Sequence, residues 1–321
     1  MNDYVGFDIG GTKCAVIAAR ADWQSCKCTI IDRKQIKTEH IPWQDTLLQL
    51  TDIAGQMSKQ NDFHPVSAGI SCGGPLDSKT GIVLSPPNLP GWDKVPVTDF
   101  IHGKLGIPSF LQNDANACTV AEWKFGAGRG FRDVIFLTFG TGLGAGLILD
   151  GRLYEGACGL AGEIGHIRLD ETGPSGYGKN GSFEGFCSGG GIAQLGRIMV
   201  GQARGKGDQS MLFDLADGDI SAKSIADAAD KGDILAQQIY TVSAERLGQG
   251  LSVLIDTLNP ECIIIGSIFA RSEHLFRNAM EKIIRKEALE LSRKICRIVP
   301  AELGNSIGDY AAVAAACGGI S

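Results

Sequence analysis

Residues 4–19 read YVGFDIGGTKCAVIAA, which is two apolar runs joined by a turn that contains two glycines and a threonine. Short apolar runs joined through Gly-Gly are typical of a β-hairpin. Asp8 ends the first run, and the glycines allow backbone N–H groups to surround an anion. On this stretch alone, a phosphate-binding hairpin and a plain Gly-Gly turn are both open readings.

A second stretch of the same kind occurs later in the chain. Residues 138–146 read TFGTGLGAG between apolar runs at 134–139 and 145–149, and they supply four glycines and two threonines. Two strand–turn–strand units predict two domains of similar construction, each with its own phosphate-binding hairpin. A third glycine site, Gly266-Ser267, follows the apolar run at 262–265 and is a candidate for contact with an adenosine.

The rest of the chain alternates short apolar runs with helical patterns, which favours an α/β fold. The long stretch at 73–96 is rich in Pro and Gly and predicts a functional loop. Further strands are expected at 29–36, 67–71, 109–112, 262–265 and 295–300, and helices at 46–61, 116–125, 234–258, 275–291 and 307–317.

Composition limits the class of protein. The 321 residues exceed the usual size of one domain, and 44% of them are hydrophobic. A net charge of −6 argues against nucleic acid as the main partner. No apolar run reaches the roughly 18 residues of a membrane helix. Ten cysteines without a C-x-x-C pair, and no signal segment, predict reduced thiols in a cytoplasmic protein.

Five short motifs carry a resemblance to a known family. They are DIGGTK at 8–13, NLPGW at 88–92, NDANA at 113–117, GTG at 140–142 and GEIGH at 162–166. In this order they resemble the ROK family of sugar kinases, within the actin-like ATPase superfamily, over nearly the whole chain. The resemblance implies two actin-like (ribonuclease H-like) α/β domains with a cleft between them. We expect a first domain at 1–115, joined by a C-terminal helix at 305–321, and a larger one at 116–304.

The resemblance also implies roles for individual residues. Asp114 matches the family's general base, and a carboxylate at a strand end can take the proton from an attacking sugar hydroxyl. The implied sugar-binding residues are Gly74, Asn88, Asn113, Asp114, Glu163, His166 and Glu184. ATP and Mg²⁺ are the implied cofactors, with Asp8 facing the metal through water, and the implied nucleotide-binding residues are Asp8, Gly10, Gly11, Thr12, Lys13, Thr138, Gly140, Thr141, Gly142, Gly266 and Ser267.

Simpler roles remain open for three of these side chains. Asp114 precedes an expected helix, so it is also a candidate N-cap. A single histidine such as His166 is more often an ordinary hydrogen-bonded residue than a ligand. Glu184, taken alone, reads as a solvated acid.

The chain departs from the family pattern at a metal site. Many members follow a histidine like His166 with C-x-C-G-x-x-G-C-x-E, whereas this chain has Ser175, Tyr177 and Ser182 at the three cysteine positions. Hydroxyl groups are poor zinc ligands beside thiolates, and the nearby Cys187 does not complete a site. We therefore expect no structural zinc. A Gly-Gly pair common in the family is also replaced, by Gly266-Ser267.

The leading hypothesis is ATP-dependent phosphorylation of a hexose or N-acetylhexosamine at the 6-hydroxyl. Glucose is the first candidate on family grounds, and N-acetylglucosamine, N-acetylmannosamine, fructose and allose stay open. A sugar-responsive regulator is an alternative, although such relatives carry a winged-helix segment before the first glycine turn, which here begins at residue 10. A non-catalytic sugar-binding protein or a nucleotide-dependent ATPase is a third. The family implies a homodimer or homotetramer.

Overall fold

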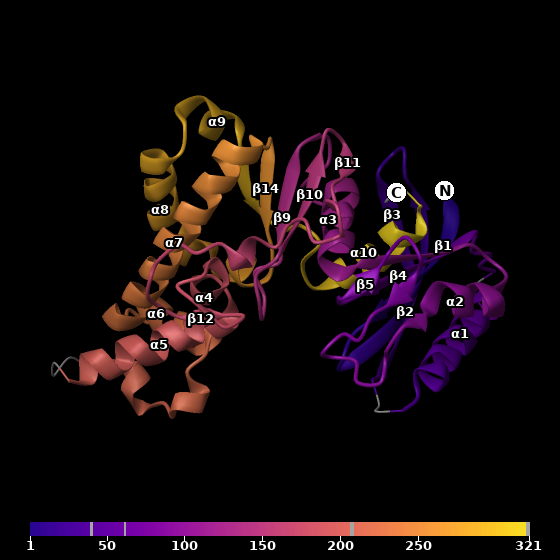
Figure 1. Cartoon of the computed structure of the whole chain (residues 1–321), viewed down its shortest axis with the longest axis horizontal. Helices are drawn as coiled ribbons and strands as arrows, with labels where there is room; N and C mark the ends of the chain where they lie inside the picture. Colours follow the sequence, from indigo (N-terminus) through magenta and orange to yellow (C-terminus); the bar gives the residue numbers. More distant parts are fainter. Residues whose placement is uncertain (39–40, 61, 206–208, 319–321) are drawn as a thin grey trace. The chain divides into compact units, whose positions relative to one another are not determined.

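The computed structural model describes residues 1–38, 41–60, 62–205 and 209–318, and it shows a mixed α/β chain (Figure 1). Contacts group the described residues into two compact units. The first comprises Met1–Arg132, Gly146–Ala161 and Glu302–Ser321, and the second comprises Asp133–Ala145 and Gly162–Ala301. This division differs from the domains expected at 1–115 with 305–321 and at 116–304, which stay a prediction. One reason for the difference is that the helix after residue 113 packs against the last helix of the chain.

The first unit is built on a five-stranded sheet of order β3-β2-β1-β4-β8. Strands β1 to β3 are antiparallel, and β4 and β8 continue the sheet in parallel with β1. Ile9 pairs with Cys14, so the first glycine turn closes the β1–β2 hairpin as predicted. The strand bounds are β1 Asn2–Ile9, β2 Lys13–Asp22, β3 Lys27–Lys37, β4 Ser67–Cys72 and β8 Ser109–Asn113.

Successive residues of β1 point to opposite faces of this sheet. Val5, Phe7 and Ile9 join the apolar core that also contains Leu47 and Leu50 of the first helix. Gly6 lies on the other face, where a Cβ would come within 2.8 Å of the Cβ of Ala312. The helices of this unit are α1 Trp43–Gln60, α2 Val97–Leu105, α3 Asp114–Phe125 and α10 Ile307–Ala316, with a 3-10 turn η4 at Gly304–Ser306.

The stretch at 73–96, expected to be a loop, contains a small antiparallel sheet of three two-residue strands. These are β5 Leu76–Asp77, β6 Ile82–Val83 and β7 Val95–Pro96, in the order β5-β6-β7. Strands of two residues are too short to show the alternation of apolar and polar residues by which longer strands are recognised in a sequence.

A second five-stranded sheet has the order β11-β10-β9-β14-β15. Its strands are β9 Val134–Leu137, β10 Ala145–Leu149, β11 Arg152–Leu153, β14 Cys262–Ile265 and β15 Arg297–Pro300. Strand β14 runs parallel to both β9 and β15. The predicted strand at 262–265 is confirmed, residue for residue.

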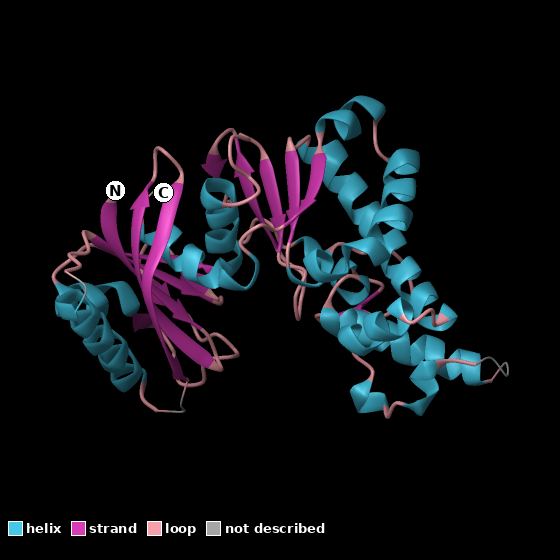
Figure 2. Ribbon diagram, turned by 180° about the vertical axis from the view of Figure 1, so that it is seen from behind, coloured by secondary structure: helices cyan, strands magenta, loops and turns pink. Residues whose placement is uncertain are grey.

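The second unit is mainly helical (Figure 2). Its predicted helix at 234–258 is confirmed as α7. The helix expected at 275–291 is wrong in its bounds, because buried Phe269 extends the helical pattern upstream and the extended Ala288 ends it. The helices are α4 Phe183–Phe186, α5 Gly189–Arg204, α6 Ala222–Asp230, α7 Ile234–Leu258, α8 Ser267–Glu287 and α9 Glu290–Ile295; the 3-10 turns are η1 Ile164–His166, η2 Met211–Asp214 and η3 Asp217–Asp219; a hairpin pairs β12 Ser175–Gly176 with β13 Lys179–Asn180. Within the described residues, no helix is long and apolar enough to cross a membrane.

Candidate functional site

The first glycine turn lies directly against the Asn88 segment. The N–H of Gly10 donates to the carbonyl of Lys13 at 3.1 Å, and the Thr38 hydroxyl donates to the carbonyl of Gly10 at 2.5 Å. A Cβ on Gly11 would lie 2.3 Å from the carbonyl oxygen of Asn88. Glycine is therefore required at 11 because another backbone occupies the space, and the turn and the Asn88 segment form one structure. Thr12 and Lys13 are exposed at the end of the turn.

Three predicted sugar-binding residues lie around Gly73-Gly74, and Gly74 is itself a fourth. The ideal Cβ position of Gly73 lies 3.5 Å from Nδ2 of Asn88 and 3.8 Å from Oδ2 of Asp114. That of Gly74 lies 3.4 Å from Nδ2 of Asn113. The absence of side chains at 73 and 74 thus leaves room in front of two amide groups and one carboxylate.

Asn113 directly precedes helix α3 and caps its first turn. Its Oδ1 accepts hydrogen bonds from the N–H groups of Ala115 at 3.0 Å and Asn116 at 3.4 Å, which makes Asn113 the N-cap of α3. The alternative in which Asp114 is the N-cap is wrong, because α3 begins at Asp114 itself. Because Oδ1 is engaged by the backbone, the amide nitrogen of Asn113 is the group that faces Gly74 and can donate to a ligand.

Asp8 is a half-buried carboxylate with acidic neighbours. Burial raises its pKa to about 6, the carboxylates of Asp309 and Asp114 add to the rise, and Lys13 and Arg33 oppose it. Arg33 Nε donates to both carboxylate oxygens of Asp309, at 2.8 and 3.0 Å. Helix α10 packs closely here, since a Cβ on Gly308 would lie 2.8 Å from Oδ2 of Asp8.

The Asp8 environment fits a hydrated magnesium ion. A buried carboxylate whose charge is disfavoured by its surroundings is stabilised when a divalent cation comes near. Mg²⁺ usually keeps several waters and takes one or two protein carboxylates, which suits a single half-buried aspartate. In the described part of the chain, no three or more His, Cys, Asp or Glu residues are arranged as a direct metal cage.

The second glycine turn is closed by its own threonine. The N–H of Thr138 donates to the carbonyl of Gly144 at 3.0 Å, and the N–H of Gly144 donates to the Thr138 hydroxyl at 3.0 Å. The predicted Gly266-Ser267 site lies beside this turn: a Cβ on Gly140 would be 3.7 Å from Oγ of Ser267. Gly140 and Ser267, predicted from separate stretches of sequence, are therefore neighbours in the second unit.

Glu184 links this turn to the GEIGH segment. Its Oε2 accepts a hydrogen bond from the N–H of Leu143 at 3.0 Å. A Cβ on Gly142 would lie 2.7 Å from the same oxygen, and a Cβ on Gly165 would lie 2.3 Å from the carbonyl oxygen of Leu143. The reading of Glu184 as a solvated acid is therefore wrong.

Glu163 precedes the short turn η1 in the same unit, and His166 is the last residue of that turn. Both are exposed, with Ile164 and Gly165 buried between them. The backbone of Gly165 fixes this turn against Leu143, and Leu143 in turn bonds Glu184. The three predicted sugar-binding residues of this unit are thus attached to one tightly packed group.

Hydrogen bonds hold the segment in which cysteines are replaced. The side-chain amide of Gln194 accepts from the N–H of Ser175 at 3.1 Å and donates to its carbonyl at 2.9 Å. Ser182 is buried and caps α4, with Oγ accepting from the N–H of Gly185 at 3.1 Å. The Tyr177 ring lies 5.1 Å from the His166 ring. Whether zinc binds stays a prediction, but each substituted position has a contact of its own.

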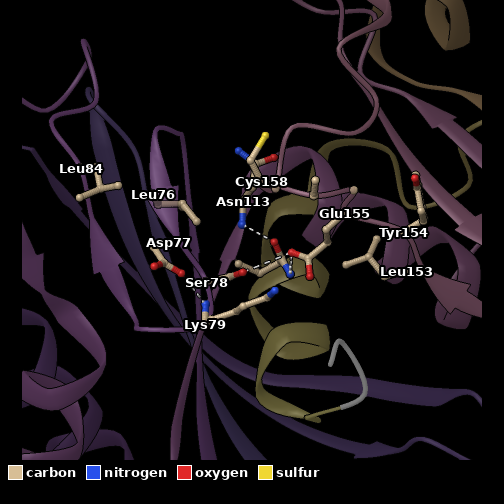
Figure 3. Close-up of a pocket in the computed structure, with 14 residues that line it drawn as sticks. Leu76, Asp77, Ser78, Lys79, Leu84, Asn113, Leu153, Tyr154, Glu155 and Cys158 are labelled. Carbon is tan, nitrogen blue, oxygen red and sulfur yellow. Dashed lines mark hydrogen bonds between the residues drawn. The ribbon is translucent and has the colours of Figure 1, made fainter.

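A cavity of about 530 Å³ opens beside Asn113 within the first unit (Figure 3). We call it the Glu155 pocket; its walls come from residues 76–79, Leu84, 112–113 and 153–159. Glu155 could not be predicted from the sequence, because a single acid in a polar loop carries no recognisable signal. Only the fold brings it next to Gln112 and Asn113.

The chain is similar to known proteins over most of its length. The ROK family model matches residues 4–317. The glucokinase of Thermotoga maritima is 32% identical over 284 residues, which are 87% of this chain and 86% of the relative. The DNA-binding transcriptional repressor Mlc of Escherichia coli is 32% identical over 224 residues, which are 70% of this chain and 53% of the repressor.

Several solved structures are similar over nearly the full length. Among them is a ROK family glucokinase from Streptomyces griseus in complex with glucose and AMPPNP, with a TM-score of 0.74, 30% identity, and coverage of 99% of this chain and 100% of that chain. ROK kinase structures have the actin-like two-domain fold, which confirms the fold class expected from the sequence.

Proposed function

We propose that this chain, which belongs to the ROK family, is a sugar kinase that transfers the γ-phosphoryl group of ATP to a hexose or an N-acetylhexosamine. The observation that carries the proposal is the group formed by Asp114, Asn113 and Asn88 around the bare backbone of Gly73-Gly74. One exposed carboxylate beside two amide nitrogens is suited to a polyhydroxylated substrate, because the carboxylate accepts a hydroxyl proton and the amides donate to neighbouring oxygens.

In the proposed reaction, Asp114 takes the proton of the attacking hydroxyl. The sugar oxygen forms a bond to the γ-phosphorus as the bond to the β,γ-bridging oxygen breaks, and ADP leaves. Asn113, fixed as the N-cap of α3, holds a neighbouring hydroxyl through Nδ2. Phosphoryl transfer depends mostly on positioning and on neutralising charge, so rigid attachment of these side chains favours the reaction.

The two glycine turns supply the proposed phosphate contacts. Backbone N–H groups of residues 10–13 and 140–142 are donors for phosphate oxygens, and the hydroxyls of Thr12 and Thr141 are further donors. Asp8 would hold Mg²⁺ through water, and when bound the ion neutralises charge on the β- and γ-phosphates. Ser267, beside Gly140, is the candidate for contact with the adenosine.

The proposed sugar contacts of the second unit are Glu163, His166 and Glu184. Their attachment to one packed group favours a fixed arrangement of hydroxyl partners. Two of the glucokinases similar to this chain make glucose the first candidate substrate, with phosphorylation at the 6-hydroxyl. N-acetylglucosamine, N-acetylmannosamine, fructose and allose are the other candidates.

The test is a coupled assay of ADP formation with Mg-ATP across these five sugars. We expect sugar-dependent ADP release for at least one of them, with glucose first. No turnover with any sugar would contradict the proposal. ADP release that does not depend on sugar would indicate an ATPase instead.

A sugar-responsive regulator is the second candidate, because the Mlc repressor is among the similar proteins. The chain spans about half the length of that repressor. Sugar-dependent binding to DNA, without sugar-dependent ADP release, would favour the regulator. A sugar-binding protein without catalysis would bind sugar but show neither activity.

Two further properties belong to the same proposal. We expect a cytoplasmic protein, and all ten cysteines are free thiols, as a reducing compartment favours. We also expect a homodimer or homotetramer, since exposed Leu289, Leu291 and Ile295 at α9 leave apolar surface available. Light scattering coupled to size-exclusion chromatography measures the oligomeric state, and a monomer at micromolar concentration would contradict this expectation.

A further inference from the structure

The Glu155 pocket is large and polar, and its walls lie entirely in the first unit. Its volume of about 530 Å³ falls within the range typical of small-molecule sites. The close-up in Figure 3 shows Ser78, Glu155 and the backbone of Asn113 converging on one wall. The proposed catalytic group uses Asn113 but leaves the rest of this space unexplained.

A hydrogen-bond network fixes the carboxylate of Glu155 in the wall. Oε1 of Glu155 accepts from the hydroxyl of Ser78 at 3.2 Å and from the amide nitrogen of Gln112 at 3.2 Å. Gln112 is 3% exposed, and its Oε1 accepts from the backbone N–H of Asn113 at 2.7 Å. The side chains of this wall are therefore held in place, and both side-chain hydrogen bonds to Glu155 use the same oxygen.

Two chain segments run from this wall into the proposed sugar site. One passes from Gln112 through Asn113 to Asp114, and the other passes from Ser78 back to Gly74. Asn113 lines the pocket, whereas Asp114 does not. A group in the pocket would thus lie beside the hydroxyl held by Asn113, away from the hydroxyl that is phosphorylated.

The charged side chains of the pocket wall indicate which kind of ligand the pocket favours. Asp77 and Glu155 bring two carboxylates, and Lys79 brings one ammonium group. A phosphate or carboxylate ligand would meet a net negative wall, which disfavours it. Hydroxyl groups donate well to carboxylates, and the exposed ring of Tyr154 offers an apolar face for a sugar ring.

We propose that the Glu155 pocket binds a second, neutral sugar ring linked to the sugar that is phosphorylated, so that the substrates include a disaccharide. This inference rests on the proposed kinase function, because it assigns the pocket to the same substrate. Glu155 accepts hydroxyl protons of the second ring, and Gln112 and Ser78 keep the carboxylate in place.

The experiment compares glucose with maltose and cellobiose as substrates of the full chain in the Mg-ATP assay. We expect turnover of at least one disaccharide. Glu155→Gln should lower the ratio of its kcat/KM to that of glucose by about 10-fold or more, since a charge-assisted hydrogen bond is lost. Ala157→Trp, which fills the pocket, should lower the same ratio at least as much. Glu171→Gln, an exposed acid outside the pocket, is the matched control and should not change the ratio.

Three outcomes test whether the Glu155 pocket binds a second sugar ring. Turnover of glucose but of neither disaccharide overturns the inference and leaves the kinase proposal standing, as does an equal effect of both variants on glucose and disaccharide. If no sugar is phosphorylated, the kinase proposal fails, and binding decides the inference. Saturation-transfer NMR should then detect maltose or cellobiose on the wild-type protein but not on Ala157→Trp, and the absence of binding to wild type overturns it.

Discussion

The two glycine turns have a common plan and different chemistry at the residue that precedes them. Asp8 stands before the turn of the first unit, and Thr138 stands before the turn of the second. Burial and nearby carboxylates raise the pKa of Asp8 to about 6, so its charge is disfavoured by the fold. Thr138 instead bonds Gly144 within its own turn. One turn keeps a charge available for a cation, and the other is stabilised by itself.

The two turns also resemble each other in how they are fixed. A Cβ on Gly11 would lie 2.3 Å from the carbonyl oxygen of Asn88, and a Cβ on Gly165 would lie 2.3 Å from that of Leu143. In each unit a glycine thus lets a proposed sugar-binding segment touch a proposed phosphate-binding turn. The comparison suggests that substrate and nucleotide contacts are coupled within each unit.

The largest expected effect is the fall in kcat when Asp114 is replaced, and it contrasts with the effect of replacing Glu163. Asp114→Asn should lower kcat by about 10²- to 10⁴-fold with little change in sugar KM, because a general base acts in the transition state. Glu163→Gln should mainly raise sugar KM. Steady-state kinetics measures both, with Asp52→Asn on the exposed face of α1 as control. An unchanged kcat in Asp114→Asn would remove the base from this account.

Alanine at the two clashing glycines is expected to have the next largest effect. Gly11→Ala and Gly165→Ala should each lower the free energy of unfolding by about 3 kcal/mol, because a methyl group would overlap a backbone oxygen. Both should also raise KM for ATP and for sugar together, if turn and sugar segment are coupled. Urea denaturation measures stability, and steady-state kinetics measures both KM values. A change in only one KM would contradict the proposed coupling.

Removing the charge of Asp8 should stabilise the protein at high pH. The folded-state pKa of about 6 exceeds the ordinary aspartate value of 3.8, so the fold loses stability as pH rises between these values. Asp8→Asn should therefore raise the free energy of unfolding by up to about 3 kcal/mol at pH 8 and by much less near pH 4. Denaturation in EDTA without nucleotide measures this. An equal gain at both pH values would contradict the assigned cause.

Glycines in open helical positions should behave in the opposite way to Gly11 and Gly165. Gly103 in α2 and Gly201 in α5 have nothing within 4 Å of an added Cβ. Gly103→Ala and Gly201→Ala should each raise the free energy of unfolding by about 0.5 to 1 kcal/mol, since alanine has less freedom in the unfolded chain. Thermal denaturation checks both, and destabilisation at either position would contradict the open geometry.

The smallest expected effect is that of a zinc chelator. Gln194 and Ser182 already hold the segment in which cysteines are replaced. Treatment with a chelator should leave Tm unchanged, and elemental analysis of purified protein should find far less than one zinc per chain. About one zinc per chain would overturn the expectation.

The sequence predicted the elements with strong local patterns. Apolar runs on either side of the glycines identified both turns, and helical spacing identified α7 with its bounds. Contacts between residues distant in sequence could not be predicted in this way. Arg33 and Asp309 are 276 positions apart, and no local sequence pattern near either residue predicts the ion pair. The bond from Leu143 to Glu184 and the wall around Glu155 were missed for the same reason.

The most direct test of the central claim is to identify the product. Phosphorus-31 NMR of a reaction containing the protein, Mg-ATP and glucose should show a hexose 6-phosphate formed in equal amount to ADP. The same reaction with Asp114→Asn should show almost none over the same time. Loss of ATP to ADP and free phosphate, or no change in the spectrum with any of the five sugars, would contradict the account.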